Sequence, residues 1–433
     1  MALYVGIDIG TSGCRATAIN HSKEVIAESS VVIPEPVSKH AGWSEQDPDI
    51  WWNALIQVLQ SLLLNIPGND VCAISIDGTS STLLVCDKNG RPLDNALMYN
   101  DTRSLDAAKT ISLHAPANSI VHGPGSSLSK CLHLLNQHKE ASYVLHQSDW
   151  LLGKLSGHFG ISDENNCLKL GFTPDNSSWP SWLKAFNLFN ARLPQVYPPG
   201  TAVASIDKAI AKQLSLPAKT RIVTGTTDST AAFIATGASK PGEAVTSLGS
   251  TLVTKVIADM PIVSTKHGVY SHKVLGQWLC GGASNSGGAA LLTFFSIEEM
   301  QALTPLLTPE QETGLDFYPL PSIGERFPIA DPDYQPRLPV HVPTDMASRA
   351  IIFQGLLEGI SRIEAQAYSL LQTLGAPYPE KVISVGGGST NTAWNKIRQK
   401  YLGVPVVQAD HSQASYGTAL LAWQGYTGSM SNQ

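Results

Sequence analysis

Residues 5–13 read Val5-Gly6-Ile7-Asp8-Ile9-Gly10-Thr11-Ser12-Gly13, an apolar strand that holds a carboxylate and ends in a turn of glycine and hydroxyl residues. The pattern returns halfway along the chain as Val245-Thr246-Ser247-Leu248-Gly249-Ser250-Thr251. In both places a second apolar stretch follows at once, so each segment predicts a β-hairpin. A turn of glycine, serine and threonine leaves backbone N–H groups and hydroxyls uncovered, and a phosphate can approach it closely.

For either hairpin alone, an ordinary tight turn is the simpler explanation, because glycine readily adopts positive φ. The repetition favours an internal duplication instead. Only the first copy carries a carboxylate, Asp8. Two such hairpins facing each other could hold the phosphates of a nucleotide together with Mg²⁺, which needs few protein carboxylates. We therefore expect Asp8 to bind the metal and five turn residues to bind phosphate: Thr11, Ser12, Gly249, Ser250 and Thr251.

Length and composition limit the class of protein. A chain of 433 residues exceeds the roughly 250–300 at which single cores stop growing, so two domains are expected. Charged residues make up 15% and the net charge is −6, which argues against a nucleic-acid binder. We expect a cytoplasmic protein without a membrane role, because no basic leader opens the chain and no apolar run approaches the ~20 residues of a spanning helix. The 6 cysteines form no C-x-x-C pair, which is typical of reduced thiols.

Strand and helix patterns alternate along the chain, which indicates an α/β protein. Two adjacent strands are predicted at 71–76 and 82–86, on either side of a small hydroxyl loop. Asp47 before Pro48 predicts a helix start, and apolar residues at helical spacing continue that helix to Leu64. The small, turn-rich stretch 235–242 predicts the domain boundary. We expect an N-terminal domain of residues 1–238 and a C-terminal domain of residues 239–433.

Further motifs accompany the two hairpins in a fixed order, and together they resemble the FGGY family of carbohydrate kinases. The family belongs to the superfamily of actin, hexokinase and heat-shock ATPases, so the resemblance implies two actin-like, ribonuclease H-like α/β domains with an interdomain cleft. It implies that sugar binds mainly to the N-terminal domain and ATP mainly to the C-terminal one. The matching segments are Gly42-Trp43-Ser44-Glu45-Gln46-Asp47-Pro48, Asn100-Asp101-Thr102-Arg103, Gly225-Thr226-Thr227-Asp228, Gly324-Glu325-Arg326, Glu358-Gly359 and Gly386-Gly387-Gly388-Ser389.

The resemblance implies that Asp228 is the general base that takes the proton of the attacking hydroxyl. Phosphoryl transfer also needs a metal and phosphate donors, for which Asp8 and the hairpins are the candidates. Asp228 lies between a predicted strand at 221–224 and a predicted helix from Ser229, so a helix N-cap is the alternative. The two roles are compatible, because a helix N-terminus and Mg²⁺ both keep a carboxylate ionised.

The sugar-binding residues implied by the resemblance lie in two segments. Many pentulose kinases have Gln-Met-His after the glycine that matches Gly78, whereas this chain resembles the shorter, D-ribulose-directed members with a Gly-Thr-Ser loop. Small hydroxyl residues can bond a polyol, and a solvated β-turn is the alternative for this loop. A second segment matches the family's Trp-Asn-Asp-x-Arg except that Tyr99 replaces the tryptophan, and a surface ion pair is the alternative. No role is assigned to residues 163–166. The expected substrate-binding residues are Asp8, Thr79, Ser80, Ser81, Asp101, Arg103 and Asp228.

The adenosine is expected beside a run of glycines. Gly386, Gly387 and Gly388 follow a predicted strand and precede a helix from about Asn391, and a glycine turn at a helix N-terminus favours an anion or a ribose. We expect Asn391 to bond the base or the ribose. The opposite wall is expected from Gly282, Asn285 and Gly287, with a flexible glycine-rich loop as the alternative.

The expected reaction is transfer of the γ-phosphate of ATP, with Mg²⁺, to the terminal hydroxyl of a ketopentose. D-ribulose is the first choice and D-xylulose the alternative. Two other classes stay open: a sugar-independent ATPase or phosphatase of the same superfamily, and a catalytically silent sugar sensor. The expected partners are the sugar and ATP, with no nucleic acid and no membrane, in a monomer or a homodimer.

Overall fold

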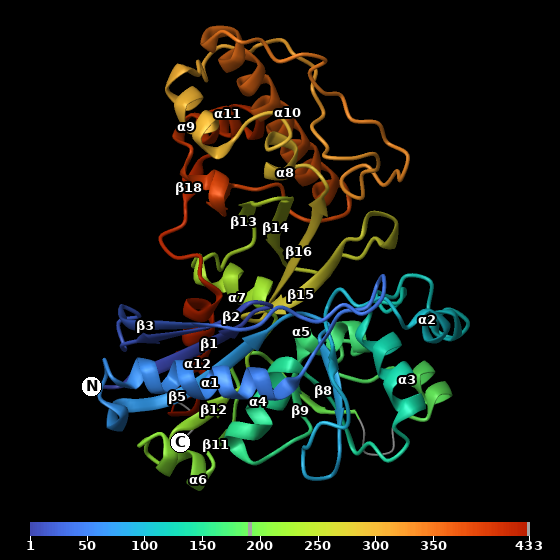
Figure 1. Ribbon diagram of the computed structural model, residues 1–433, viewed down its shortest axis with the longest axis vertical. Coiled ribbons are helices and arrows are strands. Elements are labelled where there is room, and N and C mark those ends of the chain that lie inside the picture. Colours follow the sequence, from blue (N-terminus) through green and yellow to red (C-terminus); the bar gives the residue numbers. More distant parts are fainter. Residues whose placement is uncertain (189–192, 431–433) are drawn as a thin grey trace. The chain divides into compact units, whose positions relative to one another are not determined.

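The computed structural model describes residues 1–188 and 193–430. Contacts between Cα atoms divide the chain into two compact units (Figure 1). The first unit contains Met1–Gly237 together with Gln413–Gln433, and the second contains Ala238–Ser412. Each unit is therefore described by itself.

The main sheet of the first unit has six strands in the order β11-β12-β5-β1-β2-β3. Strand β1 pairs with β2 in antiparallel fashion and with β5 in parallel fashion, and β12 extends the parallel part. The hairpin predicted from residues 5–19 is therefore confirmed. The strands are β1 (Leu3–Ile9), β2 (Gly13–Ile19), β3 (Val25–Val32), β5 (Val71–Gly78), β11 (Ala202–Ser205) and β12 (Arg221–Val223).

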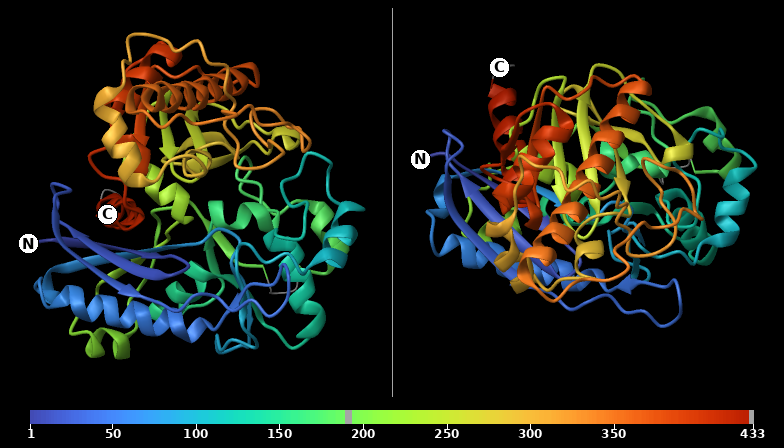
Figure 2. Two further views of the ribbon diagram at one scale, coloured as in Figure 1. Left: turned by 45° about the horizontal axis from the view of Figure 1, so that its top comes forward. Right: turned by 90° about the horizontal axis from the view of Figure 1, so that it is seen from above.

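Alternate residues of β1 face opposite sides of this sheet, because successive side chains of a strand point to opposite faces. Leu3, Val5, Ile7 and Ile9 pack in the core with helix α1 (Pro48–Leu63). Tyr4 and its neighbours on the other face pack against α12 (Ala414–Met430), and α7 (Asp228–Ala235) contacts α12. The left view of Figure 2 shows α1 on one side of the sheet and α12, seen end-on, on the other.

Two glycines allow α12 to lie against the first unit. A Cβ atom at Gly6 would overlap the backbone nitrogen of Ala419, and one at Gly417 would overlap the carbonyl of Ala231. The structure therefore differs from the expected domain of residues 239–433, since residues 413–433 belong to the first unit. The other end of the second unit, Ala238, lies one residue from the expected boundary.

A smaller sheet in the order β4-β7-β6-β8 and a pair of parallel strands, β9 and β10, complete the strands of the first unit. Strands β5 and β6 belong to different sheets, so the expectation of two adjacent strands was wrong. The chain leaves the main sheet after Gly78, and Ser81 turns it with a φ of 66°. These elements are β4 (Glu45–Gln46), β6 (Leu83–Cys86), β7 (Ala96–Leu97), β8 (Tyr143–His146), β9 (Ile161–Asp163), β10 (Gln195–Tyr197), α2 (Leu105–Ser112), α3 (Ser127–Gln137), α4 (Gln147–Ser156), α5 (Glu164–Cys167) and α6 (Lys208–Gln213).

The sheet of the second unit repeats the pairing of the first. Strands β13 and β14 form an antiparallel hairpin, β16 follows β14, and β17 and β18 extend the sheet in parallel fashion beside β13. This topology confirms the second hairpin. The elements are β13 (Glu243–Leu248), β14 (Leu252–Ala258), β15 (Tyr270–Val274), β16 (Gln277–Ser284), β17 (Lys381–Val385), β18 (Val406–Gln408), α8 (Gly288–Leu291), α9 (Ile297–Leu303), α10 (Met346–Thr373) and α11 (Thr392–Leu402).

Within residues 1–188 and 193–430, none of the helices combines the length and the apolar character that crossing a membrane requires.

Candidate active site

The parallel strands of the first unit bring three carboxylates to one edge of the sheet. Asp8 in β1 lies directly opposite Asp77 in β5. One residue further along, Gly78 pairs with Thr227, which precedes Asp228. Open α/β sheets bind their ligands outside the carboxyl ends of such strands. The edge therefore unites the two predicted catalytic residues, Asp8 and Asp228, with a third carboxylate, Asp77.

Asp8 and Asp77 share one buried environment, since their exposed fractions are 6% and 0%. Burial raises the pKa of both carboxyls, and the negative charges of Asp8 and Asp228 raise the pKa of Asp77 further. For Asp8, its hydrogen bond with Asp77 and the nearby Arg15 lower the pKa in part. We therefore assign the shared proton to Asp77 and the negative charge to Asp8.

Two neighbours hold this pair of carboxyls. Thr418 Oγ1 in α12 donates a hydrogen bond to Asp77 Oδ2, and Arg15 Nη1 lies 3.6 Å from Asp8 Oδ2. Asp77 Oδ1 has no hydrogen-bond partner among the described residues. The guanidinium of Arg15 sits on a side chain that is 56% exposed, so its charge is partly screened by solvent.

The turn of the first hairpin is open, as predicted. The N–H of Gly10 donates to the carbonyl of Gly13 over 2.9 Å, while Ser12 is exposed and Thr11 is half-buried. Both hydroxyl residues therefore stand at the surface beside the carboxyl end of β1. Their contact with phosphate stays a prediction.

Asp228 is the first residue of α7, and Thr227 is the N-cap, one residue earlier than the alternative derived from the sequence. Asp228 Oδ1 accepts a hydrogen bond from the N–H of Ser229 over 2.6 Å. Only glycine fits at Gly225, because a Cβ atom there would overlap the carbonyl of Ile76. This close approach brings the chain before Asp228 against β5.

Residues 163–166, which had no assigned role, support this segment. They are almost fully buried, and Asn165 Nδ2 donates to Thr226 Oγ1 over 3.0 Å. Asp163 accepts from the N–H groups of Asn165 and Asn166 and caps α5. Burial and the charge of Asp149 raise the pKa of Asp163 to about 7. The segment is therefore a buried polar support for the chain that leads to Asp228.

The predicted sugar loop points two of its three hydroxyls inward. Thr79 donates to Gln147 Oε1 with its N–H and with its Oγ1, both over 3.0 Å. Ser81 is buried, whereas Ser80 is half-buried. Ser80 is therefore the hydroxyl of this loop that a sugar can reach most easily.

Asp101 and Arg103 form an internal network rather than a surface ion pair. Asp101 is fully buried, and its Oδ2 accepts from the N–H of Ser44 over 2.7 Å and lies 2.7 Å from Arg103 Nη2. Arg103 Nη1 also lies 3.0 Å from Glu45 Oε2, and its guanidinium lies 3.9 Å from the ring centre of Trp43. The alternative of a surface ion pair was wrong, and direct contact with sugar stays a prediction.

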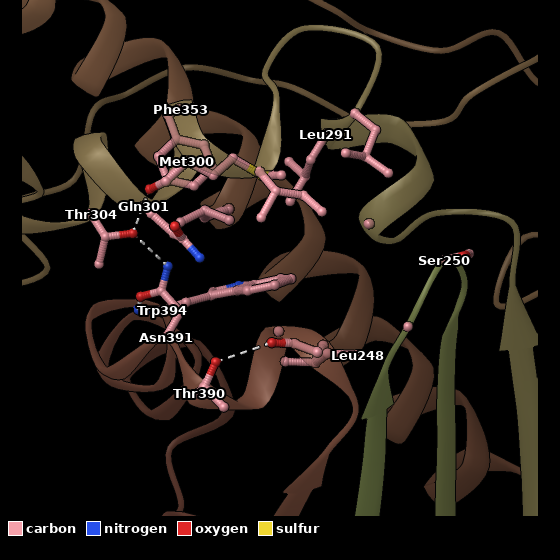
Figure 3. A pocket seen from close by; sticks show the side chains of 17 residues that line it. Leu248, Ser250, Leu291, Met300, Gln301, Thr304, Phe353, Thr390, Asn391 and Trp394 are labelled. Carbon is pink, nitrogen blue, oxygen red and sulfur yellow. Dashed lines mark hydrogen bonds between the residues drawn. The ribbon is translucent and has the colours of Figure 1, made fainter.

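The second unit contains a pocket of about 530 Å³ beside the turn of the second hairpin (Figure 3). Five of the predicted nucleotide residues line it: Gly249, Ser250, Gly387, Gly388 and Asn391. The rest of the wall is mostly apolar and comes from β13, from α8, α9, α10 and α11, and from residues next to these helices. Its residues are Leu248, Gly288, Leu291, Leu292, Ile297, Met300, Gln301, Thr304, Phe353, Leu357, Thr390 and Trp394.

The glycine run borders this pocket for steric reasons. Gly386 has a φ of 85°, and a Cβ atom there would lie 2.8 Å from the carbonyl of Leu248. A Cβ atom at Gly388 would lie 2.6 Å from the ring of Trp394, whereas one at Gly387 would meet no atom within 4 Å. Gly387 therefore faces open space.

Asn391 holds two walls of the pocket together. Its Oδ1 accepts from the N–H of Trp394 over 2.9 Å and caps α11, as the position of the predicted helix requires. Its Nδ2 donates to Thr304 Oγ1 over 3.1 Å, and Figure 3 shows this contact beside Gln301. Contact of Asn391 with the nucleotide stays a prediction.

Of the predicted nucleotide residues in the second unit, five do not line the pocket: Thr251, Gly282, Asn285, Gly287 and Gly386. Asn285 Nδ2 donates to the carbonyl of Gly324 over 2.9 Å, and its N–H donates to Glu325 Oε1 over 2.8 Å. A Cβ atom at Gly282 would lie 2.5 Å from the ring of Phe327. Asn285 and Gly282 thus shape this part of the second unit through contacts with the segment 324–327.

Reasoning from the sequence missed Asp77, Gln147 and most of the apolar wall. Asp77 had a usable signal, because it directly follows the strand predicted at 71–76, and Asp8 likewise lies near the end of the first strand. Gln147 begins α4, 68 positions after Thr79 in the chain, and nothing near either residue links them. The wall residues of α9 and α10 are ordinary apolar helix positions, so only the fold shows that they surround a pocket.

The duplicated sheet with its two glycine hairpins defines the actin-like, two-domain class of ATP-using enzymes. The chain belongs to the FGGY family of carbohydrate kinases: residues 3–235 match the N-terminal domain of that family and residues 244–425 match the C-terminal domain. It is accordingly an ATP-dependent carbohydrate kinase, a phosphotransferase with an alcohol group as acceptor. The resemblance found in the sequence and the expected fold class are confirmed.

Individual relatives agree with this family. The xylulose kinase of Staphylococcus xylosus is 24% identical, with 98% of this chain and 91% of the relative covered. The structure of a xyloylose kinase from Brucella ovis has a TM-score of 0.86 and 25% identity, with 98% of this chain and 91% of that chain covered. The structure of a gluconate kinase from Lactobacillus acidophilus has a TM-score of 0.84 and 19% identity, with coverage of 98% and 89%, and it shows the fold alone.

Proposed function

We propose that this enzyme phosphorylates a pentulose at its terminal hydroxyl and that D-xylulose is the first candidate. The observation that carries the proposal is the edge of the first unit, where Asp8, Asp77 and Asp228 lie beside the hydroxyl loop 79–81. The names of the relatives favour D-xylulose, which reverses the order expected from the sequence.

D-ribulose is the second candidate. The observation that favours it is the loop 78–81, because its Gly-Thr-Ser sequence resembles that of the D-ribulose-directed members of the family. D-xylulose and D-ribulose differ only in the configuration at C3, so one hydrogen bond can separate them. Ser80 is the half-buried hydroxyl of the loop, and Thr79 and Ser81 are buried. A neutral hydrogen bond contributes about 0.5–1.5 kcal/mol, which corresponds to about tenfold at most in affinity.

Asp228 is proposed as the general base. Its carboxylate lies at the N-terminus of α7, where the helix dipole favours the ionised form. An ionised carboxylate can accept the proton of the attacking hydroxyl, whereas burial raises the pKa of Asp77 and disfavours its ionised form. Asp228 is therefore a better candidate for the base than Asp77.

Asp8 is proposed to hold Mg²⁺. Among residues 1–188 and 193–430, no group of three or more His, Cys, Asp or Glu side chains could hold a metal ion. A single ionised carboxylate nevertheless fits, because Mg²⁺ binds through one or two carboxylates, phosphate oxygens and water. Bound Mg²⁺ would neutralise the charge of the phosphates. Asp77, which Thr418 holds by a hydrogen bond, and Arg15 lie beside the carboxylate of Asp8, and Thr11 and Ser12 offer donors to phosphate.

The pocket of the second unit is proposed as the nucleotide site. Apolar side chains such as Leu291, Met300 and Phe353 suit the flat adenine ring, and most small-molecule sites are lined in this way. Gly387 leaves room for ribose or phosphate, and Gly249 and Ser250 offer donors from the hairpin turn.

A coupled assay of ADP release with a panel of ketoses tests the proposal. We expect release that depends on a pentulose, with the highest kcat/KM for D-xylulose. Release without sugar would show an ATPase instead, and no release with any ketose would show a sensor. A higher kcat/KM for D-ribulose would make the second candidate the substrate.

A further inference from the structure

Lys130 is a fully buried lysine in α3 that the proposed reaction does not use. Its Nζ donates to three backbone carbonyls, those of Ser81 over 2.9 Å, Met98 over 2.7 Å and Tyr99 over 3.2 Å. An ammonium group has three N–H donors and no acceptor, so these three carbonyls satisfy it completely.

The environment of Lys130 is costly for a positive charge. Burial lowers the pKa of Lys130 to about 7, although the nearby charge of Asp101 opposes this shift. A buried charge is tolerated only when it is paired or fully hydrogen-bonded. Here the acceptors are backbone carbonyls of two loops. The side chain of Lys130 therefore holds the backbone of these loops and, among the residues that the structure describes, is not part of an ion pair with another side chain.

The two loops that Lys130 joins are those expected at the sugar. The carbonyl of Ser81 follows the half-buried Ser80, and the carbonyls of Met98 and Tyr99 precede the segment with Asp101 and Arg103. The second loop is linked in turn to residues 42–46, because the N–H of Met98 donates to the carbonyl of Ser44 over 2.9 Å. One ammonium group therefore sets the distance between segments that lie far apart in the sequence.

We propose that Lys130 is a positioning residue of the pentulose site, which holds Ser80 at a fixed distance from the segment 98–103. This inference rests on the proposed function, because it takes these two loops as the sugar site. Lys130 lies beneath the loops and does not itself touch the sugar. Its removal therefore changes the binding of the pentulose and leaves the nucleotide site in the second unit unchanged.

The test compares steady-state kinetics of the whole enzyme with Lys130→Met and Lys130→Arg. Lys130→Met leaves three carbonyls without their donor, and displacement of a binding loop by about 1 Å can cost up to about 100-fold. We expect the KM for the pentulose to rise at least about tenfold, while the KM for ATP stays within twofold. Lys130→Arg keeps a charged donor of another shape and should give an intermediate rise.

A matched control is Leu134→Ala, a buried residue of the same helix that packs in the core behind the loops. This variant should lower the Tm without changing the KM for the pentulose. If Lys130→Met does not fold, Lys130→Arg carries the comparison. A pentulose KM within twofold of the parent in either folded Lys130 variant would overturn the proposal, and so would an equal rise in the KM for ATP.

Ser80→Ala separates the failure of this inference from the failure of the proposed function. If Ser80→Ala leaves the pentulose KM unchanged, the loop is not part of the sugar site and the proposed function loses its sugar site. If Ser80→Ala raises that KM and Lys130→Met does not, only the role of Lys130 fails. When both act, the double variant should show less than the sum of the two effects, because Lys130 acts through the loop that carries Ser80.

Discussion

Three carboxyl groups at one edge of a sheet acquire different chemistry from their surroundings. Asp77 is fully buried beside two negative charges, and both effects raise its pKa, while the N-terminus of α7 favours a negative charge at Asp228. Asp8 lies beside Asp77 and Arg15 and carries the charge of the buried pair. The proposed roles differ accordingly: metal ligand for Asp8, hydrogen-bond partner for Asp77 and base for Asp228.

Asp228→Asn should abolish most turnover. The amide keeps the size of the side chain but cannot accept a proton, and loss of general-base catalysis alone lowers kcat by about 10²–10⁴-fold. The KM for the pentulose should change little. Steady-state kinetics with saturating Mg²⁺ measure both values, and near-normal kcat with a pentulose would disprove the base assignment.

Asp8→Asn is the matched comparison, because it makes the same chemical change at the other end of the cluster. It removes the proposed metal ligand, so its defect should appear as a higher KM for Mg²⁺ and ATP, partly restored by more Mg²⁺. If kcat of Asp8→Asn is low at every Mg²⁺ concentration and the KM for Mg²⁺ equals that of the parent, Asp8 is not the metal ligand.

Ser80→Ala should raise the KM for the pentulose by up to about tenfold, the effect of one neutral hydrogen bond. The KM for ATP in the same variant is the internal control and should stay the same. Thr79→Val offers a second comparison, because Thr79 Oγ1 bonds Gln147 and Thr82 inside the protein. Thr79→Val should lower the Tm, whereas Ser80→Ala should leave it unchanged. The Tm therefore distinguishes the loss of an internal hydrogen bond from the loss of a sugar contact.

At the scale of elements, the sequence predicted those whose signals are local. The Asp47 N-cap, the Asn391 helix start and both hairpins are confirmed, because caps and glycine turns act on the residues beside them. Predicting that β5 and β6 are adjacent was wrong, since a change of sheet depends on distant partners. For the same reason the pocket of the second unit could be predicted only along its glycine side.

A buried ion pair holds the elements behind the second hairpin. Arg398 in α11 donates to both oxygens of Glu364 in α10, each over 2.7 Å, and Thr246 in β13 donates to Glu364 Oε1 over 2.6 Å. Arg398→Met leaves the Glu364 charge buried and should lower the free energy of unfolding by about 3–5 kcal/mol.

The control for this prediction is Arg337→Met. Arg337 pairs with Asp316 over 3.2 Å at the surface, where the side chains are 49% and 77% exposed. Exposed pairs contribute about 1 kcal/mol or less. Urea unfolding of both variants measures the loss in the free energy of unfolding. Equal losses would show that the buried pair contributes no more to stability than the exposed pair.

Stability should also depend on the pH through Asp163. Burial and Asp149 raise its pKa from 3.8 to about 7, so the folded protein favours the protonated form. The stabilisation is complete below about pH 4 and is lost as the pH rises through 7. Relative to Asp163→Asn, the parent should lose free energy of unfolding between pH 4 and 7 and change no further above pH 8. Parallel urea-derived curves for the two proteins would contradict the shift.

On the scale of the whole molecule, one sheet topology occurs twice, and the first unit is built from two separate segments of the chain, 1–237 and 413–433. The duplication was visible in the sequence because both hairpins keep their glycine turns. The return of residues 413–433 was not, because the apolar pattern of α12 does not specify the unit against which it packs. What decides its place is the pair of glycines, Gly6 and Gly417, which allow close contact with β1 and α7.

The second unit is in effect inserted into the first, so residues 238–412 should fold alone. They contain their own sheet and two cores built around α10. We expect cooperative urea unfolding of this fragment and a change in tryptophan fluorescence on adding ATP, since Trp394 lines the pocket. Trp278→Phe should preserve that signal, because Trp278 is not among the lining residues.

Residues 1–237 should not fold stably without α12. They would expose Tyr4, Ile19 and Val223, and Asp77 would lose its hydrogen bond from Thr418. Joining 1–237 directly to 413–433 by a short glycine-serine linker should restore the fold, because α7 and α12 are in contact. Far-UV circular dichroism and urea unfolding compare the two fragments. Equal stability with and without α12 would show that the helix is an accessory, and the first unit would then end at Gly237.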